Sequence, residues 1–336
     1  MRGAYLDLTE KQLDERADAA YEIYRECRVC PNGCGVNRVE GQTGVCRQTD
    51  RLLVSAAVRH FGEEIPLTGI NGVGNIFLTS CNLRCAYCQN FQISQDRLGV
   101  ERSYADVADE MLRLQAFGVH FIGWVSPSHV VPGLLKSLAV ARKKGLHLPI
   151  VYNTNAYDAV PTLKLLDGIV DIYLPDLKYA DNAIAGKYSH ANGYVDFSRE
   201  AVLEMFRQVG PMTVDASGLA QRGLMVRHLV LPNNISGTWE VLCFVALELS
   251  KRVPLSLMSQ YRPVNKAPSI PELARRVTLE EYDKALHMAA DLGFETLFVQ
   301  DLNSEMHNLP DFTRTENPFP LDRPHNSVVL SMPTSS

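Results

Sequence analysis

The sequence predicts an α/β protein, a partial (β/α)6 TIM-like barrel that follows a cysteine-rich N-terminal extension. Short apolar runs alternate with capped helical segments between residues 75 and 299, which is typical of parallel strands joined by helical crossovers. The alternating part, residues 74–302, is slightly shorter than the ~250 residues of a complete eight-stranded barrel. Upstream of it lies a segment rich in cysteine. A doubly wound open sheet is the alternative layout for the same alternation.

The chain is expected to begin with a helix over residues 9–27, in which Thr9 and Gln12 form a capping box. Residues 27–51 are rich in glycine, asparagine and cysteine without periodicity, so a metal has to hold this segment. The barrel strands are then expected at the short apolar runs 75–79, 120–125, 148–153, 169–174, 224–231 and 255–260.

Helices are expected between these strands, and most of them end at a glycine. They cover residues 104–117 after the cap Ser103, 134–144, a segment from Ser198 to Gly210, 238–250, and a last helix from the capping box Thr278/Glu281 to Gly293. A final apolar run follows at residues 296–299. The predicted organisation is an N-terminal helix and metal-binding extension (1–70), the barrel (71–303) and a proline-rich irregular tail (304–336).

Composition and charge exclude several classes of protein. The 38 acidic and 33 basic residues give a net charge of −5, which argues against a broad nucleic-acid-binding surface. The longest uncharged apolar run, residues 241–247, is far shorter than the ~20 residues that cross a bilayer. The acidic start of the chain resembles neither a signal peptide nor a transit peptide. We expect a cytoplasmic protein with no membrane association, and its charge does not favour a nucleic-acid partner.

The cysteines carry the clearest chemical signal. Seven of the 8 lie between residues 27 and 88, which indicates metal or cluster ligation, whereas Cys243 is expected to be a buried small side chain. Cys81, Cys85 and Cys88 follow the first barrel strand with Cys-x3-Cys-x2-Cys spacing. Three thiolates can hold three irons of a cubane cluster and leave the fourth iron open to a substrate. The alternatives are zinc with a distant fourth ligand, or a closed cluster with a thiol from the N-terminal group.

A second set consists of Cys27, Cys30, Cys34 and Cys46. Four thiols make a closed site that suits either zinc or an auxiliary iron–sulfur cluster, and the spacing does not choose between them. A structural staple and an electron-transfer station are both compatible with this set. A zinc ribbon that binds nucleic acid is a further alternative, which the acidic residues interleaved with the nearby arginines do not favour.

The loop from Cys81 to Cys88, with Tyr87 before its last cysteine, resembles the signature of the radical S-adenosylmethionine (radical SAM) superfamily. The chain from about residue 27 to 300 resembles the branch related to pyruvate formate-lyase activating enzyme. The segments that carry this second resemblance are 72–77, 89–90, 152–155, 171–179, 227–232 and 258–261.

This resemblance implies a 4Fe–4S cluster on the loop after the first strand, with catalysis resting on Cys81, Cys85 and Cys88. S-adenosylmethionine would chelate the open iron. One electron from a donor such as flavodoxin or ferredoxin would cleave its S–C5′ bond, and the resulting 5′-deoxyadenosyl radical would remove a hydrogen atom from a substrate. Ligands are expected at the carboxyl ends of the strands.

The resemblance also implies cofactor contacts at these strand ends. Tyr87 is expected near the adenine. Ser126 and Ser128 stand where the superfamily usually has a Gly-Gly-Glu-Pro-like segment, and they offer oxygen acceptors in place of its glutamate. His129, beside them, would be a switchable donor or base.

After the third strand, Asn153 and Asn155 stand where activases place an aspartate first, and Asn155 is expected to contact the ribose or the methionine. Asp176 and Lys178 match an activase Asp-x-Lys, so Lys178 would pair with the methionyl carboxylate while Asp176 meets the ribose or the amino group. A mutual ion pair without a cofactor role is the alternative. His228 is expected to be a satisfied core histidine.

Three hypotheses for function follow. The first is an activase that installs a glycyl radical on a partner protein. The second is a radical SAM enzyme that modifies another protein, a small molecule or a nucleic acid. The third is a non-catalytic iron–sulfur or zinc protein, which predicts no cleavage of the cofactor.

Overall fold

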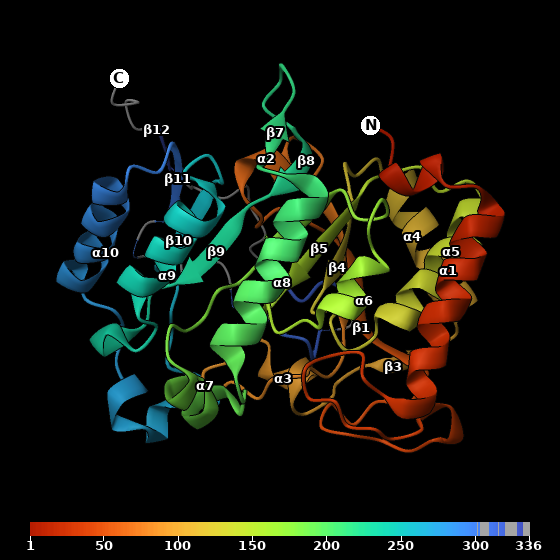
Figure 1. The fold of residues 1–336 in the computed structure, drawn as a ribbon, viewed down its shortest axis with the longest axis horizontal. Coiled ribbons are helices and arrows are strands. Elements are labelled where there is room, and N and C mark those ends of the chain that lie inside the picture. Colours follow the sequence, from red (N-terminus) through yellow and green to blue (C-terminus); the bar gives the residue numbers. More distant parts are fainter. Residues whose placement is uncertain (301, 303–308, 315, 320–327, 332–336) are drawn as a thin grey trace.

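Parallel strands form the centre of the structure, a computed structural model that describes residues 1–300, 302, 309–314, 316–319 and 328–331 (Figure 1). The first sheet contains, side by side, β2 (Val73–Leu78), β4 (Ile122–Val125), β5 (Ile150–Thr154) and β6 (Ile172–Pro175). The second contains β9 (Val226–Leu229), β10 (Leu255–Met258) and β11 (Thr296–Val299), also parallel. A parallel bridge between Asp176 and Arg227 joins the two sheets. The expected partial barrel is confirmed, with strand ends that differ by a few residues.

Antiparallel strands that the sequence did not predict flank this parallel array. β1 (Leu52–His60) pairs with β2, and β3 (Val100–Arg102) pairs with the start of β1. β8 (Ala220–Leu224) pairs parallel with β6 and antiparallel with β7 (Thr213–Val214), with which it forms a hairpin that extends beyond the barrel (Figure 1). β1 lies in the predicted N-terminal extension (1–70), yet it pairs with β2 of the predicted barrel (71–303).

The end of the chain differs from its expected irregular form. β12 (Val328–Ser331) pairs antiparallel with β11, so the described part of the tail contains a strand. Phe312 and Phe319 are buried against Phe77 of β2. The sequence did not predict this structure, because the tail is rich in proline and its partners, β11 and Phe77, lie far away in the sequence.

Helices cover the strands on both sides of the barrel, with α1, α4 and α5 together on one side and α9 and α10 on the other (Figure 1). The helices are α1 (Glu10–Glu22), α2 (Ile65–Thr68), α3 (Phe91–Ser94), α4 (Tyr104–Ala116), α5 (Val131–Lys143), α6 (Val160–Lys164), α7 (Asn182–Ser189), α8 (Tyr194–Val209), α9 (Thr238–Phe244) and α10 (Leu279–Leu292). None in the described residues is long and apolar enough to cross a bilayer.

Local sequence signals set most of these helix ends. Capping boxes form at Thr9, Ser103 and Thr278, as expected for the first and last of these, and Gly293 ends α10 in a left-handed conformation. One expectation was wrong, since α8 begins before Ser198, whose hydroxyl donates within the helix to the Val195 carbonyl. The expected helix over residues 238–250 is α9 followed by a π-helical turn, Val245–Ser250.

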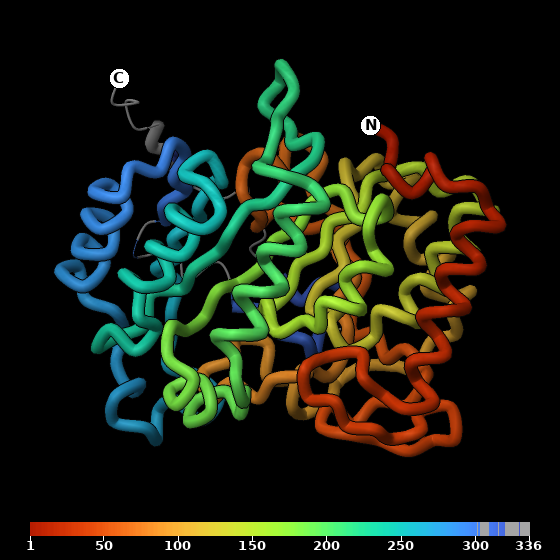
Figure 2. The backbone as a smooth tube through the Cα atoms, in the orientation of Figure 1, coloured from red at the N-terminus to blue at the C-terminus, as the bar shows by residue number. Residues whose placement is uncertain are grey.

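The segment with the N-terminal cysteines folds back against the barrel, at the end where the cysteine loop after β2 also lies (Figure 2). Gln48 Nε2 donates to the Thr79 carbonyl at 2.9 Å, and Arg84 Nη2 donates to the Val45 carbonyl at 3.0 Å. The two cysteine-rich stretches therefore share one packed region.

Candidate active site

The carboxyl ends of the parallel strands surround a cavity of about 200 Å³. Because parallel strands end at the same edge, residues from distant parts of the chain meet here. The predicted residues that line the cavity are Cys81, Cys85, Tyr87, Cys88, Ser126, Asn153, Asn155, Asp176 and Lys178. Ser128 lies outside it.

A left-handed turn and backbone hydrogen bonds fix the position of the loop that follows β2. Ser80 has a positive φ of 72°, a left-handed turn that directs the chain away from the strand, and its N–H donates to the Ile93 carbonyl at 2.9 Å. The N–H groups of Arg84 and Ala86 donate to carbonyls at the end of α7, at 2.9 and 2.7 Å. Backbone hydrogen bonds to α3 and α7 therefore hold the loop in place.

The three thiols of the loop all accept or share polar contacts. Cys81 Sγ accepts from Asn155 Nδ2 at 3.3 Å, Cys85 Sγ accepts from Ser189 Oγ at 3.0 Å, and Cys88 Sγ lies 3.3 Å from Ser94 Oγ. Donors to sulfur stabilise thiolates, as a cluster requires.

Burial raises the pKa of the Cys81 thiol to about 12 and that of Cys88 to about 11. Burial also raises the pKa of Cys85, which Lys178 and Ser189 partly offset. A metal must therefore displace protons when it binds. Three thiols from one loop line the cavity together with no fourth cysteine, and this donor set fits a cluster with one open iron.

Asp176 and Lys178 form an ion pair of 2.9 Å at the cavity wall. Burial opposes the charge on Lys178, but Asp176 and the Cys85 thiol outweigh it, so the pKa of Lys178 lies above its usual value. The Tyr194 hydroxyl donates to the Asp176 carbonyl and accepts from the Lys178 N–H, at 2.9 and 3.0 Å. A rigid cation and a carboxylate thus face the cavity side by side.

The segment after β4 is divided between the cavity and the core. Ser126, with a positive φ of 57°, lines the cavity. Ser128 is buried and its hydroxyl lies 2.8 Å from Thr154 Oγ1, in a network that ends on Asp158. The cofactor contact expected of Ser128 stays a prediction.

His129 lies outside the cavity, next to the start of the loop that carries Cys81, Cys85 and Cys88. Its Nε2 donates to the Thr79 carbonyl at 3.0 Å. Burial, assisted by the charge of Arg38, lowers the pKa of His129 to about 4. The imidazole is therefore neutral near pH 7.

Asn155 directly contacts the loop that carries Cys81, Cys85 and Cys88. Besides the contact with Cys81, its Nδ2 donates to Asn82 Oδ1 at 2.8 Å, and its Oδ1 accepts from the Tyr157 N–H at 2.9 Å. Asn153 lines the cavity at the end of β5. The structure thus places Asn155 beside the Cys81 sulfur, and its expected contact with the ribose or the methionine stays a prediction.

Tyr87 is buried with its ring 5.8 Å from that of Tyr261 and 6.4 Å from that of Tyr179, both in edge-to-face geometry. Tyr261 and Gln260 line the same cavity. His228 is a satisfied core histidine, as expected, because its ring nitrogens contact the Leu177 carbonyl and Thr238 Oγ1.

Arg227 is the main site residue that sequence reasoning missed. It lines the cavity while its buried guanidinium pairs with Glu63 and Glu64, and Nε lies 2.9 Å from Glu64 Oε1. Burial would raise the pKa of Glu63, but Arg227 outweighs it and lowers this pKa to about 2. An arginine inside an apolar strand was the available signal, since such a charge needs a buried partner.

The four N-terminal cysteines converge on a separate small cavity, which Arg38 and His129 also line. Nowhere in the described residues do three or more His, Cys, Asp or Glu side chains approach closely enough to share a single metal ion. In a cubane cluster, by contrast, each thiolate binds a separate iron.

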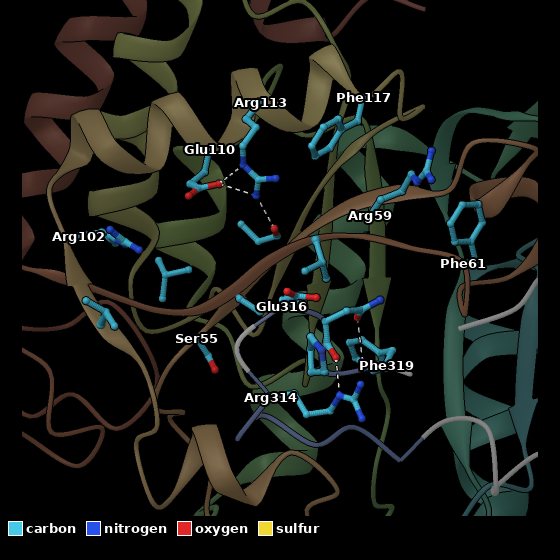
Figure 3. Close-up of a pocket in the computed structure, with 17 residues that line it drawn as sticks. Ser55, Arg59, Phe61, Arg102, Glu110, Arg113, Phe117, Arg314, Glu316 and Phe319 are labelled. Atoms are coloured by element: carbon cyan, nitrogen blue, oxygen red, sulfur yellow. Dashed lines mark hydrogen bonds and ion pairs between the residues drawn. The ribbon is translucent and has the colours of Figure 1, made fainter. Parts of the chain in front are cut away.

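A larger hollow of about 650 Å³ lies between β1, α4 and residues 314 and 316–319 (Figure 3). Arg113 pairs with Glu110 there and donates to the Ala57 carbonyl. Arg59, Arg102 and Arg314 also line it. Its lining contains no cysteine, whereas Cys81, Cys85 and Cys88 line the smaller cavity.

The chain is similar to several known proteins. The model of the family described as "Radical SAM superfamily" matches residues 75–215. The uncharacterized protein MJ0674 of Methanocaldococcus jannaschii is 30% identical over 296 residues, covering 85% of this chain and 80% of the relative. MJ0808 of the same organism is 24% identical over 300 residues, covering 80% and 82%. A radical SAM methyltransferase from Sphaerobacter thermophilus aligns with a TM-score of 0.45 and 14% identity, covering 67% of this chain and 65% of that chain.

Proposed function

The chain belongs to the radical SAM superfamily, and from this premise we propose that it activates or modifies a partner protein by removing a hydrogen atom from it. Cys81, Cys85 and Cys88 would hold the 4Fe–4S cluster. When bound, the cluster and S-adenosylmethionine supply one-electron reductive cleavage of the cofactor. The proposal includes a one-electron donor of the flavodoxin or ferredoxin class. It also places the enzyme in the cytoplasm, whose reducing conditions suit eight free cysteines.

The residues of the cavity have separate tasks in this proposal. Lys178 orients the cofactor carboxylate through its charge, and Asp176 fixes the position of that ammonium group at 2.9 Å. Asn153 and Ser126 offer polar atoms from neighbouring strand ends. The ring of Tyr87, packed in edge-to-face contacts, closes the side of the cavity against water.

The size of the cavity carries the choice of a protein as the substrate. Its volume of about 200 Å³ lies below the roughly 300–1,000 Å³ of cavities that enclose drug-sized ligands. The cluster and S-adenosylmethionine would already occupy such a cavity, which favours a hydrogen donor that is not enclosed with them. Such a donor would reach the mouth of the cavity from outside, as a projecting loop of a partner does. A glycyl-radical enzyme is the partner we propose.

The test is transfer of a hydrogen atom from a defined partner. Anaerobically reconstituted enzyme is reduced and mixed with S-adenosylmethionine and a glycyl-radical enzyme whose glycines carry deuterium. We expect deuterium in the 5′-deoxyadenosine formed and a glycyl radical in the electron paramagnetic resonance (EPR) spectrum. Cys85→Ala is the control that should form neither. 5′-Deoxyadenosine without deuterium, formed at the same rate with and without the partner, would contradict the choice of partner.

A further inference from the structure

The N-terminal cysteines form a second redox candidate that the proposed function does not use. Cys27, Cys30, Cys34 and Cys46 line one small cavity, although Cys46 lies well along the chain from the others. The backbone N–H of Val45 points to Cys34 Sγ at 3.4 Å. Four thiols around one cavity leave no position for an external ligand, so the site suits a closed centre.

Arg38 indicates that this centre carries negative charge. The side chain is buried, and Nη1 lies 3.9 Å from Cys27 Sγ. Its other contacts are neutral, namely the carbonyls of Thr49 and His129 and the ring of Tyr24. Within the described part of the chain no carboxylate pairs with it.

A buried guanidinium needs an anionic neighbour, because removing its charge from water is strongly unfavourable. Four protonated thiols would not provide one. Four thiolates around a doubly charged metal core carry a net charge of about −2, which compensates Arg38. The environment of Arg38 thus fits a metal-loaded site.

A short connection joins this site to the cluster loop. Asn32 Nδ2 points to Cys30 Sγ at 3.7 Å and donates to the Asn82 carbonyl at 2.9 Å. Asn82 is buried and directly follows Cys81 in the chain. The path from the Cys30 thiol to Cys81 therefore runs through the Asn32 side chain and the backbone of Asn82. A purely structural metal needs no such connection.

We propose that Cys27, Cys30, Cys34 and Cys46 bind an auxiliary 4Fe–4S cluster that passes one electron to the cluster at Cys81, Cys85 and Cys88 through Asn32 and Asn82. A reduced flavoprotein or ferredoxin gives one electron to the auxiliary cluster. That cluster is reoxidised as the second cluster is reduced by the same electron. No proton or other atom is transferred between them. The proposal rests on the radical SAM assignment and is independent of the partner.

The first test identifies the metal. The triple variant Cys81→Ala, Cys85→Ala, Cys88→Ala is reconstituted anaerobically with iron, sulfide and zinc, and its metal content and reduced EPR spectrum are measured. We expect about four irons per chain and a cluster signal, both lost when Cys30→Ala and Cys34→Ala are added. One zinc without iron, or no bound metal, would overturn the proposal. Either result stands whether or not the wild-type enzyme cleaves S-adenosylmethionine.

The second test addresses the electron path. Asn32→Ala removes both contacts of the bridge, and Asn37→Ala is the matched control, since Asn37 caps a short turn at Glu40. Reduction of the cluster at Cys81 by reduced flavodoxin is followed by rapid-freeze EPR. We expect a several-fold slower reduction in Asn32→Ala with unchanged iron content, and no change in Asn37→Ala. Equal rates in both variants would refute the relay.

Discussion

Replacing Arg227 with methionine removes the cation that two buried carboxylates share. Glu63 and Glu64 have side chains only 8% and 7% exposed, and neither can move its charge into water without unfolding. Loss of one partner from a buried ion pair typically destabilises a protein by about 3–5 kcal/mol. The lowered pKa of Glu63, to which His60 and Asn75 also contribute, gives a figure of the same order. A fall from 4.5 to about 2 corresponds to about 3 kcal/mol of stability near pH 7.

We expect Arg227→Met to lose this free energy of unfolding in anaerobic urea denaturation at pH 7. Arg113→Met is the matched control, because the Arg113 side chain is 44% exposed and its pair with Glu110 contributes at most about 1 kcal/mol. The combination Glu63→Gln, Glu64→Gln, Arg227→Met should recover part of the loss, since no buried charge is left unpaired. Equal losses in Arg227→Met and the control would refute the reasoning.

The sign of the pH dependence follows from the same pKa. The folded-state pKa of Glu63 lies below its unfolded value, so its contribution is complete above about pH 4.5 and is lost as the pH falls toward about 2. Wild-type stability should therefore fall over this window more steeply than that of the combined variant. Parallel urea midpoints for both proteins between pH 6 and the lowest pH that keeps them soluble would contradict this.

The remaining predictions concern the cavity. Cys85→Ala should lose the iron of the cluster proposed at Cys81, Cys85 and Cys88 and all formation of 5′-deoxyadenosine, as measured by iron analysis and chromatography. Cleavage of S-adenosylmethionine at the wild-type rate would contradict the assignment of Cys85 as a cluster ligand. Lys178→Met should weaken S-adenosylmethionine binding about 10- to 100-fold in calorimetry without loss of iron, while Lys144→Met, which breaks a surface pair, should not; equal affinities would remove Lys178 from the site. Asn155→Leu should make the cluster potential more negative in EPR titration, because a donor to Cys81 favours the reduced state; an unchanged potential would show that this contact has no electronic effect.

Local patterns predicted much of this molecule. The strands of the barrel and the capping boxes at Thr9 and Thr278 depend on residues close in sequence, and they formed where expected. The same holds for the three cysteines of the loop, since their spacing alone brings them together at the cavity. Asp176 and Lys178 also face one side, as residues two apart in extended chain should.

Features that depend on distant partners could not be predicted in this way. β1 and β12 pair antiparallel at the borders of the barrel, outside the strand–helix alternation. The pairing of Arg227 with Glu63 spans 164 residues. Neither carboxylate carries any sequence signal of burial, and only the folded sheet brings Asn155 to the sulfur of Cys81.

The strands at the borders of the barrel limit how another chain can approach it. β3 pairs with the start of β1, and Arg113 donates a hydrogen bond to the Ala57 carbonyl farther along β1. At the other border, β12 pairs with β11. β3 and β12 have three and four residues, so the outer edges that they offer to a foreign strand are short. Recognition by strand addition is therefore disfavoured at both borders. A partner protein of the kind proposed above would then be recognised by side chains and loops around the cavity.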